Sequence, residues 1–450
     1  MRKVIIVVFT LMAIFCLSVE CIEYAHAQDI CYCECPCPDA GADSDTDIDT
    51  DADTDTDSDT DVDTETDTEE PEIVLSRYPA NDLHSPITYS VAQRLRGIVE
   101  SAPDGQNGLA QFGDSISVGK TVLSCYNTFD YEIAYSWETS TRLESYFDPE
   151  DSFINFFLDQ NIDPAESDQT AAHRMTSYTT PLDREPIATR VSHTCNALLP
   201  YLQPELDDAN PAFMIAMCGA NNASSTQSAG IVTDRFIEEI LQMIDTTLAH
   251  NTIPILRSTP TQIKDDPRPG NLATMNVMLR AVAQSYQIPY ANLHDEFLDI
   301  TMENYGLSSD GVHLNSPGYL RVCHFNEENL VYGKNQQNLI IGQQLDRAVA
   351  VTFGGTSHLD PEPIGYIGSG TENDPVVVDE IPFVHHGDIS APVYYSMDAT
   401  SDVRIVVVDE PGADVDIRIG GNTYDNQYDG APANFSIDPV STGRYWLTVQ

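Results

Sequence analysis

Residues 213–222 read Phe-Met-Ile-Ala-Met-Cys-Gly-Ala-Asn-Asn, a wholly apolar run that stops at a glycine and two asparagines. A short apolar run that ends at a turn residue is typical of a strand buried on both faces, as in a parallel sheet. The run Ile253-Pro-Ile-Leu256 repeats the pattern, and residues 288–293 predict a third strand.

Two amphipathic segments separate these predicted strands. Apolar residues recur at helical spacing from 233 to 250, which predicts a helix. Residues 273–286 predict a second helix, and its methionine-rich face is expected to pack in the core. The alternation of strands and helices predicts an α/β domain built on a parallel sheet.

The C-terminal part of the chain has a different pattern. Residues 355–374 are rich in glycine and proline and predict a linker. Apolar and polar residues then alternate in 403–407 and 415–419, and residues 445–449 close the chain with a β-rich run. Short alternating segments separated by turn residues predict a small antiparallel β-sandwich over 375–450.

The charge balance excludes one class of partner. The 450-residue chain has 71 acidic and 21 basic residues, a formal net charge of −50. Nucleic-acid binding needs lysine and arginine to neutralise phosphates, so we expect no nucleic-acid partner. The same balance disfavours docking on anionic lipid.

Part of this charge lies in one tract. Residues 39–72 contain 17 acidic residues and no lysine or arginine, with aspartate alternating with small polar and apolar residues. Such a tract buries almost nothing and repels itself, which predicts an extended, solvated spacer. Weak calcium binding is the alternative. Calcium loops need a glycine for their sharp turn and a distal glutamate, and no glycine lies between Ala42 and Glu72.

The N-terminus has the features of an export signal. Met1-Arg2-Lys3 precedes a mostly apolar run over 4–19, and Ala25-His26-Ala27 forms a small-x-small site. This pattern predicts a cleaved signal peptide, residues 1–27. A membrane anchor is the alternative, but 16 apolar residues are short for a span. We expect a protein that is secreted or at the cell surface, whose mature form does not span the membrane.

Eight cysteines would remain after cleavage. In an oxidising compartment, disulfides are the favoured reading of both the alternating N-terminal cluster and the scattered cysteines. A soft-metal site in the cluster is the alternative, but the spacing lacks the two-residue gaps of a zinc knuckle, and we expect no metal. The pairing cannot be read from the sequence. These cysteines are Cys31, Cys33, Cys35, Cys37, Cys125, Cys195, Cys218 and Cys323.

Three segments of the α/β region carry the groups that a serine hydrolase needs. They are Phe112-Gly-Asp-Ser-Ile-Ser-Val-Gly119, Gly219-Ala-Asn-Asn222 and Asp310-Gly-Val-His313. The first two are expected to follow strands, where open α/β sheets bind their ligands. Alone, each segment is equally well read as a turn, a helix cap or a surface loop.

Together the three segments predict a catalytic triad. Ser115 would attack, His313 would accept its proton, and Asp310 would orient His313. The amide of Asn221 would donate to the oxyanion.

These segments resemble conserved blocks of the SGNH (GDSL-type) hydrolase family. Gly113-Asp-Ser-Ile-Ser117 resembles its first block, Gly219-x-Asn221 its third, and Asp310-x-x-His313 its fifth, within a region of about 76–350. The run from Cys323 to Leu339 is similar to a secreted bacterial branch. The resemblance implies a flavodoxin-like three-layer α/β/α sandwich that hydrolyses carboxylic esters without a metal or other cofactor.

The sequence departs from this family at two places. The second block supplies a glycine whose N–H completes the oxyanion hole, but no glycine lies between Gly119 and Gly219. Thr170 or Ala171 is the expected substitute, beside the N–H of Ser115 and the amide of Asn221. Asn222 stands where the family commonly has aspartate.

Other conspicuous residues have plainer interpretations. His173 is expected on a helix surface, His294 in a structural position, and His385-His386 in an exposed loop. Arg174 or Arg257 would line the cleft if the substrate were anionic. The C-terminal region resembles prepeptidase C-terminal β-sandwich domains. Most of its aromatic residues are expected to pack, although they could stack on sugars; they are Tyr394, Tyr395, Tyr424, Tyr428, Tyr445 and Trp446.

The predicted organisation follows from these observations. It comprises a signal peptide (1–27), a cysteine cluster with an acidic linker (28–75), an SGNH hydrolase-like domain (76–354), a linker (355–374) and a β-sandwich (375–450). The predicted function is a secreted serine esterase that acts on a small ester, an acylated polysaccharide or a lipid. The alternative is a catalytically inactive SGNH-fold protein that mediates binding or adhesion at the cell surface.

Overall fold

The computed structural model describes a large part of the chain in several segments. The predicted signal peptide, cysteine cluster and acidic linker lie outside them. The described residues are 75–102, 106–118, 122–123, 184–263, 268–299, 306–318, 325, 328–354, 359–398 and 402–450.

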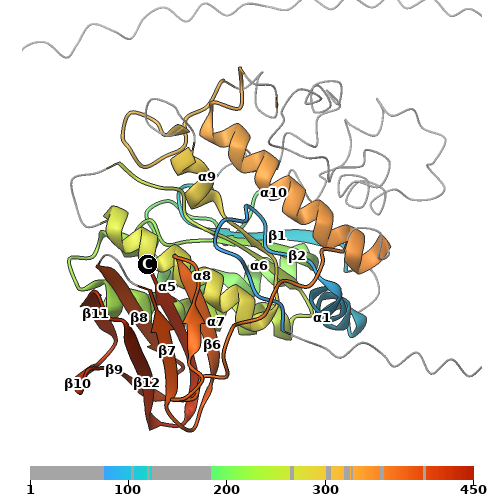
Figure 1. Cartoon of the computed structure of the whole chain (residues 1–450). Coiled ribbons are helices and arrows are strands. Elements are labelled where there is room, and N and C mark those ends of the chain that lie inside the picture. Colours follow the sequence, from blue (N-terminus) through green and yellow to red (C-terminus); the bar gives the residue numbers. More distant parts are fainter. Residues whose placement is uncertain are drawn as a thin grey trace, which may run out of the picture. The chain divides into compact units, whose positions relative to one another are not determined.

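A parallel sheet forms the centre of the α/β region (Figure 1). Its strand order is β1-β2-β3-β4, and each neighbouring pair is parallel. Every residue of β1, β2 and β3 is buried, as the continuous apolar runs predicted for β2 and β3. The strands are β1 (Gly108–Gly113), β2 (Pro211–Met217), β3 (Ile253–Arg257) and β4 (Tyr290–Ala291).

The third predicted strand is shorter than expected. β4 keeps only two of the residues in 288–293. Leu293 already begins the next helix, α9, and Pro289 has no N–H to donate to a sheet.

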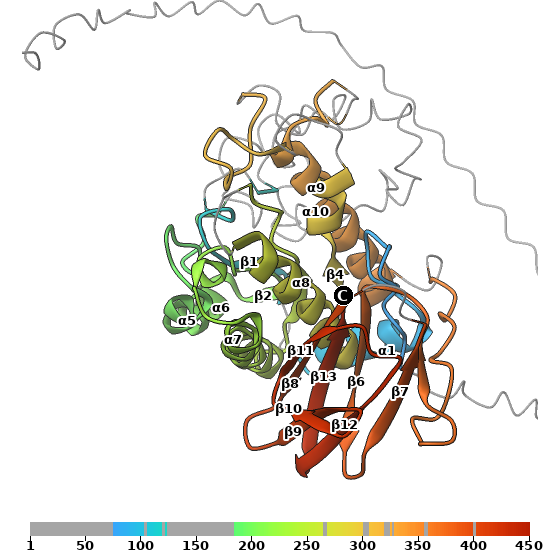
Figure 2. The same ribbon diagram turned by 60° about the vertical axis from the view of Figure 1, so that its left-hand side comes forward.

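Helices cover the sheet on both faces (Figures 1 and 2). α7 and α8 pack against each other. α1 and α10 each contact β3, and each also contacts η7. The two predicted helices are present, and both begin earlier than expected. The side chain of Ser228 caps the N-terminus of α7, and α8 begins at Arg268. The helices are α1 (Tyr89–Glu100), α5 (Cys195–Leu198), η3 (Leu199–Tyr201), α6 (Leu202–Ala209), η4 (Asn222–Ser224), α7 (Ala229–Ala249), α8 (Arg268–Tyr286), α9 (Leu293–Asp299), α10 (Gly333–Val349) and the π-helical η7 (Ala350–Gly354).

Two packed sheets form the C-terminal region. One has the order β10-β9-β12-β7-β5 and the other β11-β8-β13-β6. All pairs are antiparallel except β5 with β7, which is parallel. The strands are β5 (Val376–Val378), β6 (Phe383–Ile389), β7 (Val393–Met397), β8 (Val403–Asp409), β9 (Asp414–Ile419), β10 (Asn422–Tyr424), β11 (Gln427–Gly430), β12 (Asn434–Ser441) and β13 (Gly443–Val449). The predicted α/β class with a C-terminal β-sandwich is confirmed.

The β-sandwich packs directly on the α/β region, within one compact unit that spans 70–450. Its strands β6 and β13 contact α8, and β8 contacts α7. Trp446 is fully buried and belongs to the same core cluster as the parallel sheet. Arg77 adds polar contacts, donating to Asp379 at 2.7 and 3.1 Å and to Glu380 at 2.8 Å. The two regions therefore share a core.

Replacing Trp446 by alanine tests this shared core. The variant leaves a large cavity between the two regions, and we expect it to lose about 3–5 kcal/mol of unfolding free energy. Urea unfolding should remain a single transition when followed by near-UV and far-UV circular dichroism. Val440→Ala, at a side chain that is 59% exposed, is the matched control and should change stability little. Separate unfolding of the two regions would contradict the shared core.

The exposed loop predicted for His385 and His386 is wrong. Both residues lie in β6, and the ring of His385 is hydrogen-bonded to the hydroxyls of Tyr395 at 2.9 Å and Tyr445 at 3.2 Å. Burial lowers the pKa of His385 to about 3 and that of His386 to about 4. The buried Tyr395, Tyr445 and Trp446 confirm packing as the role of these three aromatic residues.

The low pKa of His385 predicts sensitivity to acid. Below pH 6.5 the unfolded chain takes up a proton here, while the folded ring stays neutral down to about pH 3. Stability should therefore fall as the pH falls through this interval. Between pH 6.5 and 5.0, we expect wild type to lose about 1–2 kcal/mol more unfolding free energy than His385→Gln, measured by urea titration. An equal loss in both proteins would contradict this assignment.

No helix in the described segments is long and apolar enough to cross a bilayer.

Candidate active site

Ser115 lies in a turn at the end of β1. The turn is closed by hydrogen bonds from the N–H groups of Ser117, at 2.9 Å, and Val118, at 3.2 Å, to the carbonyl of Asp114. This places Ser115 at the carboxyl edge of the parallel sheet, half-buried, as the sequence predicted.

His313 approaches Ser115 from a loop far along the chain. Its Nε2 lies 2.9 Å from Ser115 Oγ, and its Nδ1 lies 2.6 Å from Asp310 Oδ2. The structure thus brings together all three side chains of the predicted triad. The distances match a nucleophile, a base and the group that orients the base.

The loop that carries Asp310 is held by the same carboxylate. Asp310 Oδ1 accepts hydrogen bonds from the N–H groups of Val312 at 2.9 Å and His313 at 3.0 Å, and from the hydroxyl of Ser308 at 2.7 Å. Partial burial opposes ionisation, but the hydrogen bonds, led by that from the His313 side chain, hold the pKa of Asp310 well below its usual range. Asp310 is therefore a carboxylate at neutral pH.

The site is open to solvent. The side chains of Asp310 and His313 are each 47% exposed. The imidazole and the carboxylate are therefore accessible to solvent.

A buried carboxylate joins the ends of two strands. Asp114 accepts hydrogen bonds from the N–H of Ile116, within its own turn, and from that of Ala220, after β2, both at 3.1 Å. Burial raises the pKa of Asp114, and these hydrogen bonds oppose the shift. The contact fixes the serine turn against the loop that contains Asn221.

Asn221 caps the short helix η4, and its side-chain Nδ2 donates to the carbonyl of His193 at 3.0 Å. The preceding Gly219 has a φ of +136°, and an added Cβ would lie 3.1 Å from the side chain of Met275. Glycine is thus required for the turn that leads to Asn221. One N–H of the Asn221 amide contacts His193, and the other is left for a further acceptor.

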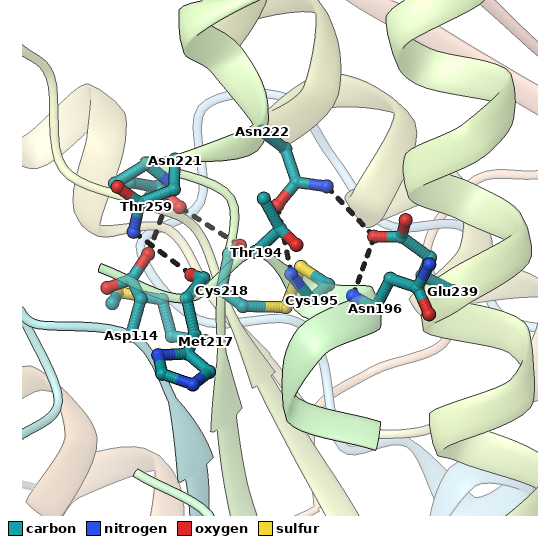
Figure 3. Close-up of a disulfide and its surroundings, with 12 residues drawn as sticks. Asp114, Thr194, Cys195, Asn196, Met217, Cys218, Asn221, Asn222, Glu239 and Thr259 are labelled. Atoms are coloured by element: carbon teal, nitrogen blue, oxygen red, sulfur yellow. Dashed lines mark hydrogen bonds between the residues drawn. A yellow bond between two sulfur atoms is a disulfide. The ribbon is translucent and has the colours of Figure 1, made fainter. Parts of the chain in front are cut away.

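A disulfide and a polar cluster hold this loop in place (Figure 3). Cys195 is bonded to Cys218, which joins the start of α5 to the end of β2. Asn222 accepts a hydrogen bond from the N–H of Cys195 at 3.0 Å and donates to Glu239 Oε2 at 2.8 Å. An aspartate at 222 would set one carboxylate against another, which explains the asparagine here. The sequence had given Asn222 no role.

Arg257 does not line an open cleft, contrary to the expectation for an anionic substrate. It is 1% exposed, and its Nη2 donates to Ser117 Oγ at 2.7 Å. Burial lowers the pKa of Arg257 to about 9, against the attraction of Asp114. This cation supports the serine turn from inside the protein.

The structural position predicted for His294 is confirmed. It is buried in α9, and burial lowers its pKa.

Several predicted residues lie outside the described segments. They are Thr170, Ala171, His173, Arg174, Cys125, Cys323 and the Cys31–Cys37 cluster.

Among the described residues, no group of three or more histidine, cysteine, aspartate or glutamate side chains could hold a metal ion.

Comparison with protein families gives one match. Residues 151–321 match the model of the GDSL-like lipase/acylhydrolase family. The matched range contains Asn221, Asp310 and His313, and Ser115 precedes it. A search of curated proteins gave no match.

Solved structures of the same class are similar to this chain at low identity. A lipase/acylhydrolase from Enterococcus faecalis is 15% identical, with a TM-score of 0.34, over 53% of this chain and 95% of that one. A GDSL-like lipase from Bacteroides thetaiotaomicron is 14% identical, with a TM-score of 0.31, over 57% and 99%. A carbohydrate esterase family 3 protein from Talaromyces cellulolyticus is 15% identical, with a TM-score of 0.32, over 53% and 95%.

Proposed function

This chain carries a domain of the GDSL-like lipase/acylhydrolase family, and on that premise we propose that it is a serine esterase with Ser115 as its nucleophile. One observation carries the proposal: Ser115 Oγ lies 2.9 Å from His313 Nε2, while His313 Nδ1 lies 2.6 Å from Asp310. A serine hydroxyl is a weak nucleophile unless a base takes its proton, and this chain of contacts supplies one.

The reaction proceeds in two halves. Ser115 Oγ attacks the ester carbonyl while its proton passes to His313 Nε2, and Asp310 stabilises the resulting imidazolium. The N–H of Ser115 and the amide of Asn221 stabilise the oxyanion. The intermediate collapses, and His313 gives its proton to the departing alcohol. Water, deprotonated by His313, then attacks the acyl-enzyme. When this second intermediate collapses, His313 gives the proton to Ser115 Oγ, and the carboxylic acid is released.

The substrate we propose is an acylated polysaccharide outside the cell. The half-exposed Asp310 and His313 support this, because a polymer can lie across an open site. The net charge of −50 disfavours approach to anionic lipid surfaces. The N-terminal residues 1–27 support export, with secretion or cell-surface attachment as the outcome.

A comparison of three substrates tests this assignment. Purified protein is incubated separately with acetylated xylan, p-nitrophenyl acetate and p-nitrophenyl palmitate, and the released acid is measured. We expect acetate from the first two and little palmitate. Preference for palmitate would replace the polysaccharide with a lipid substrate.

The competing function is an inactive binding or adhesion protein at the cell surface. The absence of any glycine between Gly119 and Gly219 favours it, because the oxyanion hole then lacks its usual donor. Hydrolysis of none of the three esters, together with retention on insoluble xylan, would support this function instead.

A further inference from the structure

We propose that Arg190 forms a subsite for a carboxylate, and that the esterase acts on an acylated polysaccharide that contains uronic acid units. The inference rests on the proposed esterase function and names the class of its substrate. It gives Arg190 the role that the sequence analysis considered for Arg174 and Arg257, that of a cation beside the active site.

Arg190 lies next to the strand that leads to Ser115. Thr189 forms a parallel bridge with Gly113, the last residue of β1, and the N–H of Arg190 donates to the carbonyl of Gly113 at 2.9 Å. Both chains leave this bridge in the same direction, because the pairing is parallel. Arg190 and Ser115 therefore lie at the same edge of the sheet.

Tyr201 lies at this edge too, because α6 runs antiparallel to β1. After the end of α6, the carbonyl of Asn210 accepts a hydrogen bond from the N–H of Gly108, at the start of β1. Within α6, Glu205 accepts one from the N–H of Gln111, further along β1. Tyr201, which directly precedes α6, is therefore at the end of β1 that leads to the catalytic serine.

The guanidinium group of Arg190 stacks on the ring of Tyr201. Its central carbon lies 3.6 Å from the ring centre. The ring of His193 meets the same tyrosine edge-on, with the ring centres 6.3 Å apart, and the carbonyl of His193 accepts the hydrogen bond from Asn221 Nδ2. Between Arg190 and His193 the chain turns at Ser192, which has a left-handed φ of +62°. The guanidinium group therefore adjoins the loop that carries Asn221.

This guanidinium group has no hydrogen bond and no ion pair within the described segments. The Nε of Arg190 is buried and has no partner. Four other arginines share this unpaired Nε, but each of them donates through a terminal nitrogen; they are Arg184, Arg257, Arg280 and Arg347. A chain with 71 acidic residues offers many partners to an arginine. A cation left unpaired beside the active site therefore indicates that its partner is a ligand.

A carboxylate is the group that fits this arginine best. The planar guanidinium group presents parallel N–H donors that match the two oxygens of a carboxylate, and stacking on Tyr201 fixes its plane. His193 supplies a neighbouring acceptor. Its Nδ1 donates to the carbonyl of Val191 at 2.8 Å, so Nε2 of the neutral ring carries no proton and can accept from a sugar hydroxyl. A carboxylate site beside a hydroxyl acceptor fits a uronic acid unit.

The net charge of the chain makes a local cation necessary for such a substrate. A charge of −50 repels an anionic polymer, but salt screens this repulsion beyond about 8 Å. Recognition of the carboxylate then depends on short-range pairing, which Arg190 provides.

Matched substrates test this subsite. Acetylated oligogalacturonides are compared with the same oligosaccharides after conversion of their carboxylates to primary amides, and the acetate released by the full chain is measured. We expect the KM of wild type to be at least about 10-fold lower for the carboxylate form, because hydrogen bonds between charged groups are the stronger ones. In Arg190→Gln the two KM values should become similar. Arg190→Lys, which keeps the charge without the planar fork, should keep part of the difference.

Arg404→Gln is the matched control, because it removes the same charge from the surface of the sandwich. It should keep the wild-type ratio of the two KM values. Equal KM values in wild type, or the wild-type ratio in Arg190→Gln, would overturn the inference. In either case, hydrolysis of p-nitrophenyl acetate by wild type leaves the esterase proposal intact. If wild type releases acetate from none of the three substrates, the esterase proposal fails and the inference fails with it.

Discussion

Replacing Ser115 by alanine is expected to lower kcat for p-nitrophenyl acetate by roughly 10⁴-fold or more. The remaining kcat is the residual rate that the surrounding polar groups support without the nucleophile. The substitution removes the hydroxyl that forms the covalent bond. Among the described residues, no other hydroxyl is hydrogen-bonded to His313 Nε2. The hydroxyl makes no other hydrogen bond in the described segments, so the fold should be unchanged. Initial rates and the thermal unfolding midpoint measure both effects.

The matched control for this substitution is Ser441→Ala. Ser441 is partly exposed in β12, and within the described segments its hydroxyl donates only to the carbonyl of Gly412. It should retain wild-type kcat. Wild-type activity in Ser115→Ala would show that another group attacks the ester.

Exchanging Asp310 for asparagine is expected to lower kcat about 10³-fold. The carboxylate accepts a hydrogen bond from the protonated Nδ1 of His313, at 2.6 Å. Nε2 is then unprotonated and can take the serine proton. The amide is neutral and can present N–H groups to Nδ1, which favours the wrong tautomer. It also no longer stabilises the imidazolium. The asparagine oxygen can still accept from the N–H groups of Val312 and His313, so the loop should persist.

The control for the charge change is Asp429→Asn. Asp429 pairs with Arg404 at 2.9 Å on the surface of the sandwich, and exposed pairs contribute little to stability. Its kcat should equal that of wild type. If Asp310→Asn retained more than about a tenth of wild-type kcat, His313 would need another orienting group.

Local sequence patterns predicted the framework of the site well. The apolar run at 213–218 became the buried strand β2, and Ser115 follows β1 at the sheet edge. Asp310 and His313 are three residues apart, so their pairing depends only on one loop. These features depend on neighbours in sequence, which a periodicity or a short spacing records.

Features that depend on distant partners were not predicted. The bond between Cys195 and Cys218 and the bridge from Thr189 to Gly113 join segments with no shared pattern. The left-handed Ser192 has no sequence signal, because the residue type disfavours that conformation. His385 was assigned to a loop because its burial against Tyr395 and Tyr445, which lie on other strands of the sandwich, leaves no local periodicity.

The central claim is that Ser115 is an activated nucleophile. The most direct test is to treat the full chain with a fluorophosphonate, digest it and locate the adduct by mass spectrometry. We predict one stoichiometric adduct, on Ser115, that is lost in Ser115→Ala and forms much more slowly in Asp310→Asn. An unmodified Ser115, or an adduct on a different residue at the same rate, would contradict the account.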